Sequence, residues 1–107
     1  MIPQGQSVLL IGCEDGLLLS ALRPRRGVGV ENDERLLNCA RARNPAHEYI
    51  TAPDWNPTFD ERFDYVVIND VLDHADDVFC LLQAIHTACA AATRLIVIHP
   101  SPWRRAF

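Results

Sequence analysis

Short hydrophobic runs alternate with amphipathic stretches along almost the whole chain. The runs predict five strands, at residues 7–11, 27–30, 48–51, 63–68 and 94–98. Helical spacing predicts three helices between them. The first covers 17–22, the second is capped by Asn32 or Asp33 and ends before Asn44, and the third runs from Asp76 or Asp77 through Cys89. Strict alternation of strands and helices is typical of a parallel sheet built from βαβ units. The pattern therefore predicts one α/β domain, a Rossmann-like doubly wound sheet of about five strands in a three-layer α/β/α arrangement.

Length and charge narrow the class of protein. A chain of 107 residues fits a single domain, and a net charge of −4 argues against nucleic acid or an anionic membrane surface as partner. No stretch approaches the roughly 20 apolar residues of a membrane-spanning helix, and no secretory signal is evident at the start. The four cysteines form no Cys-x-x-Cys pair, and the histidines have no metal-site spacing. We therefore expect a cytoplasmic protein with reduced thiols and no metal ion.

Candidate chemistry gathers where the predicted strands end. Ligands of open parallel sheets bind beyond the carboxyl ends of the strands, where the strand order reverses. The first strand ends in a turn bounded by Gly12 and Gly16, and glycine permits tight turns and close approach of a ligand. The second strand ends at Glu31, 19 residues after Gly12, where a carboxylate can accept the hydroxyls of ribose. These residues predict a nucleotide-type ligand, and the alternative is that the glycines only shape the turn.

Two acids inside that turn narrow the choice of ligand. Glu14 and Asp15 stand at the start of the first predicted helix, where a pyrophosphate would seek the positive end of the helix dipole. Their carboxylates would repel it, which disfavours an NAD-dependent oxidoreductase. A ligand that carries an ammonium and a sulfonium group would be accommodated. The alternative is that the acids only cap the helix.

Taken in order, these motifs resemble those of class I S-adenosylmethionine (SAM)-dependent methyltransferases. Residues 8–16 resemble the family's first motif, residues 27–31 the second, residues 63–74 the fourth-strand segment and residues 94–98 the fifth strand. The resemblance covers nearly the whole chain and implies a strand order of 3-2-1-4-5 with SAM as cofactor. The chain departs from the family pattern at Leu10, Glu14 and Pro53, which stand where an acid, a glycine and an acid are common.

The resemblance also implies a role for each matching residue. Gly12 and Gly16, with the backbone of Cys13 and Glu14, would pass under the methionine part of SAM, and Glu31 would hold the ribose. The remaining roles fall on two later segments: Asp54 or Trp55 would meet the adenine, and Asn69 and Asp70 would face the methyl group. No catalytic base is assigned.

The family sheet normally continues past its fifth strand with a helix and an antiparallel hairpin. This chain ends at Phe107, so we expect a truncated core without the C-terminal β-hairpin. The fifth strand would then be an apolar edge, open unless a second copy, a fused domain or a partner covers it. Two functions follow: a SAM-dependent methyltransferase of unknown acceptor, or a catalytically inactive module of the same fold that serves in protein interaction or dimerisation.

Overall fold

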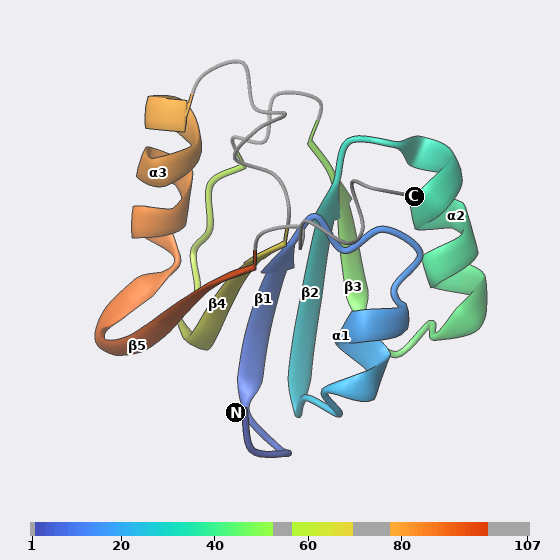
Figure 1. Cartoon of the computed structure of the whole chain (residues 1–107), viewed down its shortest axis with the longest axis horizontal. Helices are drawn as coiled ribbons and strands as arrows, with labels where there is room; N and C mark the ends of the chain where they lie inside the picture. Colours follow the sequence, from blue (N-terminus) through green and yellow to red (C-terminus); the bar gives the residue numbers. More distant parts are fainter. Residues whose placement is uncertain (1, 53–56, 70–77, 99–107) are drawn as a thin grey trace, which may run out of the picture.

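The computed structural model describes residues 2–52, 57–69 and 78–98, and their strands form one parallel sheet. The strand order is β3-β2-β1-β4-β5, which confirms the predicted order (Figure 1). The strands and helices follow one another along the chain as β1 (Ser7–Ile11), α1 (Leu17–Ala21), β2 (Arg26–Glu31), α2 (Glu34–Arg43), β3 (Glu48–Thr51), β4 (Phe63–Asn69), α3 (Val78–Thr87) and β5 (Cys89–Ile98).

Two hydrophobic cores lie on opposite faces of the sheet. All five residues of β1 are buried, because this strand occupies the centre of the sheet with helices on both sides. Leu9 and Ile11 of β1 pack with Leu81 and Ile85 of α3 on one face. Alternate β1 side chains point the other way, where Leu10 packs with residues of α1 and α2. Figure 1 shows α3 apart from α1 and α2, as the predicted three-layer arrangement requires.

The prediction for the last helix and strand was wrong at their junction. The sequence pattern carried the helix through Cys89 and began the strand at Arg94, whereas α3 ends at Thr87 and β5 begins at Cys89. The N–H of Ala88 donates to the carbonyl of Ile85 in a tight turn, which stops the helix. The start of the third helix at Asp76 or Asp77 lies outside the described residues.

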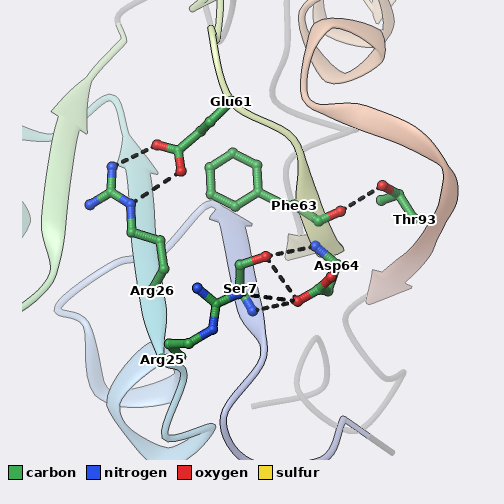
Figure 2. A network of polar contacts seen from close by, with 7 residues as sticks. All are labelled: Ser7, Arg25, Arg26, Glu61, Phe63, Asp64 and Thr93. Atoms are coloured by element: carbon green, nitrogen blue, oxygen red, sulfur yellow. Dashed lines mark hydrogen bonds and ion pairs between the residues drawn. The ribbon is translucent and has the colours of Figure 1, made fainter.

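The first half of β5 is irregular, and the second half is not. Cys89 pairs with Phe63 and Arg94 with Tyr65, so the intervening residues of β5 bulge out of the ladder. The hydroxyl of Thr93 donates to the Phe63 carbonyl at 2.5 Å and closes the bulge (Figure 2). Residues 94–98 then pair in regular register, and these are the residues that the hydrophobic run predicts.

A polar network fixes the amino ends of β1 and β4 (Figure 2). Oδ2 of Asp64 accepts the backbone N–H of Ser7 at 2.9 Å and its hydroxyl at 3.0 Å, and the N–H of Asp64 donates to Ser7 Oγ. These hydrogen bonds lower the pKa of Asp64, with the Ser7 N–H as the largest cause and the Arg25 guanidinium adding to it. Beside this network, Arg26 forms a two-pronged ion pair with Glu61. The network lies at the amino ends of the strands, whereas the predicted ligand site lies at their carboxyl ends.

The helices of the described segments are short. None of them, in residues 2–52, 57–69 and 78–98, is long and apolar enough to cross a membrane.

Candidate functional site

The turn between β1 and α1 is built from left-handed backbone. Gly12, Glu14 and Gly16 have φ angles of 84°, 53° and 82°. A side chain at Gly16 would place its Cβ 2.9 Å from the Cβ of Ala40, so only glycine lets α1 begin this close to α2. Glu14 has no such freedom, and its conformation costs about 1–2 kcal/mol for a residue with a Cβ. The surroundings of the turn therefore impose its shape.

Glu31 at the end of β2 supplies most of that constraint. Its Oε1 accepts the N–H of Glu14 at 2.9 Å, and its Oε2 accepts the N–H groups of Asn32 at 2.9 Å and Asp33 at 3.2 Å. Glu31 is only 5% exposed. A carboxylate offers about four acceptor positions, so these bonds from described residues leave one, on Oε1. That position is what the site can offer to a ligand hydroxyl.

The backbone amides of the turn already have acceptors. The N–H groups of Gly12 and Cys13 both donate to the Val30 carbonyl, at 2.8 and 3.1 Å, and the N–H of Gly16 donates to the Cys13 carbonyl at 2.9 Å. A pyrophosphate at a glycine turn uses such amides as its donors. Because these amides and that of Glu14 are engaged, the geometry argues against a dinucleotide.

Asn69 connects the turn to the other neighbour of β1. Its Nδ2 donates to the Gly12 carbonyl at 3.1 Å, from the end of β4. Since β1 lies between β2 and β4, Glu31 and Asn69 flank the turn from both sides. The structure thus brings together six predicted residues, Gly12, Cys13, Glu14, Gly16, Glu31 and Asn69. The other three, Asp54, Trp55 and Asp70, lie outside the described residues.

Cys13 is a packing residue inside the turn. It is 2% exposed, and its Sγ lies 2.8 Å from where a Cβ on Gly29 would stand. Burial, and after it the carboxylate of Glu31, raises the pKa of the Cys13 thiol to about 12. The thiol is therefore protonated at neutral pH and is no candidate for nucleophilic catalysis.

Sequence reasoning missed Tyr49, which packs against the turn from β3. Tyr49 of β3 donates its hydroxyl to the Asn44 carbonyl at 2.9 Å, and the same oxygen lies 3.5 Å from a Cβ built on Gly16. The edge of its ring lies 3.2 Å from a Cβ built on Gly29. The only signal in the sequence was the presence of Gly29 in a strand interior, which indicates close approach of another group.

The comparisons with known proteins place this geometry in a family. The family model described as methionine biosynthesis protein MetW matches residues 1–103. The bifunctional methionine biosynthesis protein MetXA/MetW of Rhodopirellula baltica is 35% identical over 95 aligned residues, and the match covers 78% of this chain. The match covers 15% of that protein, so the chain spans only a small part of the relative's length.

Solved structures give the same fold. A TehB-like SAM-dependent methyltransferase from Corynebacterium glutamicum has a TM-score of 0.75 and 25% identity over 89% of this chain and 55% of its own. A SAM-dependent methyltransferase from Thiobacillus denitrificans, in complex with S-adenosyl-L-homocysteine, has a TM-score of 0.72 and 16% identity. The match covers 90% of this chain and 42% of that protein. The chain spans about half the length of these proteins, and its five strands have the methyltransferase order. With a family model that matches nearly all of its residues, the chain belongs to the MetW family, on a class I SAM-dependent methyltransferase fold.

Proposed function

We propose that this chain binds SAM at the carboxyl ends of its parallel strands, as a cytoplasmic methyltransferase or methyltransferase-like domain. The observation that carries the proposal is Glu31, which is buried, bonded to the Glu14 amide, and left with one acceptor position beside the turn. The S-adenosyl-L-homocysteine complex of the Thiobacillus denitrificans relative supports the same ligand class.

Each predicted residue keeps its role in this proposal. Gly12 and Gly16 pass under the methionine part of SAM with the backbone of Cys13 and Glu14, and Glu31 accepts a ribose hydroxyl. The roles at the two ends of the ligand fall to Asp54 or Trp55 for the adenine, and to Asn69 and Asp70 for the methyl end. Asn69 orients this end through its bond to Gly12.

The charge of the site suits a cationic ligand. After burial, which is the largest cause, the carboxylates of Glu31, Glu14 and Asp15 raise the pKa of Cys13, which is consistent with a negative potential at the turn. SAM supplies a sulfonium whose methyl group is reactive, so the protein contributes position and electrostatics more than chemistry of its own. The residues of the turn would hold the sulfonium end, and the acceptor is not specified by them.

The test is calorimetric titration of the whole chain with SAM, with NAD as the competing ligand. We expect heat with SAM and none with NAD. Glu31→Gln replaces one carboxylate oxygen with an amide nitrogen that cannot accept, and removes the negative charge. It should therefore weaken SAM binding by about tenfold or more, the effect of losing one charge-assisted hydrogen bond. Glu48→Gln is the matched control, because Glu48 is a carboxylate at the start of β3, at the amino ends of the strands and away from the turn.

Two outcomes contradict the proposal in different ways. Absence of heat with SAM in the folded wild-type chain would refute SAM binding itself. Equal SAM affinity of the wild type and Glu31→Gln would refute the ribose assignment alone. Circular dichroism of each variant shows that the loss comes from the site and not from unfolding.

A second candidate function rests on the fused relative. In Rhodopirellula baltica a MetW region is part of one chain with MetXA, which favours a module that acts beside another protein. In this second candidate the module serves in protein interaction and transfers no methyl group itself. Incubation of the chain with methyl-labelled SAM and a metabolite extract separates the two candidates. Label in a metabolite indicates a methyltransferase, whereas SAM binding without any transfer indicates the silent module.

A further inference from the structure

His47 lies between the end of α2 and the start of β3, and its ring packs against β2. A Cβ added to Gly27 of β2 would stand 2.8 Å from Nδ1 of His47 and 2.9 Å from the side chain of Pro24. The imidazole is half-buried, and it meets the ring of Tyr49 edge-on with the centroids 6.4 Å apart. Packing on two sides therefore holds the ring in one place.

The hydrogen bonds of Asn44 determine which nitrogen of His47 carries a proton. Oδ1 of Asn44 accepts the backbone N–H of Ala46 at 3.1 Å, which orients the amide with Nδ2 toward the ring. This Nδ2 lies 3.2 Å from Nε2 of His47, and it also donates to Oγ of Ser20 at 3.4 Å. An amide nitrogen only donates. Nε2 must therefore accept, and the ring must be neutral with its proton on Nδ1.

The same Asn44 connects the histidine to the turn between β1 and α1. Its carbonyl accepts the hydroxyl of Tyr49 at 2.9 Å. Tyr49 is 8% exposed, and its hydroxyl oxygen lies 3.5 Å from a Cβ built on Gly16, the last residue of the turn. The contacts therefore run from His47 through Asn44 and Tyr49 to the turn.

A proton on Nε2 is incompatible with this arrangement. An imidazolium carries an N–H at both nitrogens, so the Nε2–H of His47 would face the Nδ2 hydrogens of Asn44. Turning the amide over would relieve this repulsion but would leave the N–H of Ala46 facing a nitrogen instead of its acceptor. Either the ring leaves Gly27 or Asn44 changes its hydrogen bonds, and both disturb the segment that holds Tyr49.

We propose that His47 is a pH-sensitive switch that acts on the turn. When neutral, His47 accepts from Asn44 and keeps Tyr49 packed against Gly16. When protonated, it releases Asn44 and the turn loosens. The switch is a property of the free chain, and only its effect on SAM affinity rests on the proposed function.

The charged groups near the ring are ion-paired or positive. Those that are paired are Arg26 with Glu48 at 3.0 Å, Arg43 with Asp15 at 3.4 Å and Arg25 with Asp64 at 3.8 Å. Arg23 precedes Pro24 and is exposed, and the residues of α1 carry no charge. The titratable neighbour within β3 is Tyr49, whose pKa is raised by burial, so it stays neutral. An arginine nearby adds to the cost of a positive charge on His47.

The direction of the pH effect follows from the burial of the ring. Burial lowers the pKa of His47 below its ordinary value of 6.5. A base whose pKa is lowered by folding contributes stability that is fully present above the ordinary value, and this stability is lost as pH falls through the lowered value. The switch therefore acts on the acid side of neutrality.

The first test is an NMR titration of His47 in the wild type and in Asn44→Asp. In the variant, one carboxylate oxygen can still accept the Ala46 N–H, and the other faces Nε2 and can accept its proton. The pKa of His47 should lie below 6.5 in the wild type and should rise above 6.5 in Asn44→Asp. A wild-type pKa that is not lowered, or one that Asn44→Asp leaves unchanged, overturns the switch. If the variant fails to fold, the wild-type tautomer decides, because a proton on Nε2 of the neutral ring refutes the proposal.

The second test is hydrogen exchange of the Gly16 amide, which donates to the Cys13 carbonyl at 2.9 Å. From about pH 7.5 to about pH 5.5, the local opening constant of the wild type should rise about threefold or more, the effect of losing one neutral hydrogen bond. His47→Gln does not titrate and should show no such rise. His86→Gln is the matched control, because His86 is exposed on α3 and the variant should respond as the wild type does. Equal responses of the wild type and His47→Gln refute the coupling to the turn.

SAM titration at the same two pH values is read separately. We expect the dissociation constant of the wild type to rise at the lower pH by more than that of His47→Gln. Absence of SAM binding at both values refutes the proposed function and leaves the exchange result in force. SAM binding with an equal pH response in both proteins refutes the effect of the switch on the ligand.

Discussion

The two sides of β1 differ in which residues they expose, charged residues on one side and apolar residues on the other. On one side, β2 and β3 lie under α2, whose exposed positions carry charges, and Glu34 of this helix accepts the hydroxyl of Thr51 in β3. On the other side, β4 and β5 lie under an uncharged α3, and apolar side chains reach the surface. The first half closes itself with its own residues. Among the described residues, α3 and β5 therefore leave large apolar side chains exposed, whereas α2 carries charged residues at its surface.

The largest expected effect compares a buried leucine, which packs against α1 and α2, with an exposed leucine of β5. Leu10 of β1 is fully buried, so Leu10→Ala should lower the free energy of unfolding by about 2–5 kcal/mol. Leu95 of β5 is 50% exposed, and Leu95→Ala should cost about 1 kcal/mol or less. Urea unfolding measures both. Equal losses would remove the distinction between the two leucines, and a Leu95→Ala loss close to zero would sharpen it.

Gly16→Ala should be the next largest perturbation, and it probes the tight packing of the first half. The substitution combines a φ of 82° with a Cβ placed 2.9 Å from Ala40, so we expect a loss of roughly 2–4 kcal/mol in the free energy of unfolding. Gly5→Ala is a matched control, because Gly5 has a φ of 79° but nothing within 4 Å. Gly5→Ala should cost only the backbone strain, about 1 kcal/mol. A Gly16→Ala loss no larger than this would show that α1 and α2 can separate freely.

Glu14→Gly should stabilise the protein by a smaller amount. Glycine removes the strain of a φ of 53° while the backbone N–H keeps its bond to Glu31. The relief is offset in part by the greater entropy of glycine in the unfolded chain, so we expect a gain of about 0.5–1 kcal/mol. Glu14→Ala removes the same carboxylate and keeps the strain, so its thermal unfolding should show no such gain. If both variants gain equally, charge repulsion in the turn and not backbone strain is the cause.

The smallest effect concerns the hydrogen bonds that hold β1 to β4, the junction of the two halves. The pKa of Asp64 is lowered chiefly by the Ser7 N–H and then by the Ser7 hydroxyl. A carboxyl whose pKa is depressed by folding stabilises the protein above its usual pKa, and this contribution is lost as pH falls through the lowered value. Ser7→Ala removes the hydroxyl and keeps the N–H, so the pKa should rise only part of the way. An NMR titration of Asp64 measures this, and an unchanged pKa in Ser7→Ala would contradict the assigned contribution of the hydroxyl.

Much of the fold could be predicted because the buried strands are continuous apolar runs. The third strand was predicted with the residues that β3 has, and Asp33 proved to be the N-cap where Asn32 had been equally open. The last junction was misjudged because Ala88 and Cys89 continue the helical spacing of α3, and local periodicity does not register the pairing of Cys89 with Phe63. Strand pairing between distant residues overrides the local preference there.

The proximity of the candidate residues could be predicted, but their hydrogen bonds could not. The rule that ligands bind at the carboxyl ends of parallel strands was enough to group the turn with Glu31 and Asn69. Nothing in the sequence indicates that Glu31 accepts three backbone N–H groups, or that the amide of Glu14 is one of them. The bond from the Glu14 amide goes with a left-handed Glu14, which sequence preference alone would have disfavoured.

By itself the sequence determined the alternation of strands and helices, the glycine-bounded turn and the acid that ends β2, because burial on both faces and left-handed backbone restrict residue types locally. The tertiary structure alone decided which donors reach the Glu31 carboxylate, that the Cys13 thiol is buried, and where α3 ends and β5 begins. These properties arise from distances between segments far apart in the chain, and local residue preference carries no information about them.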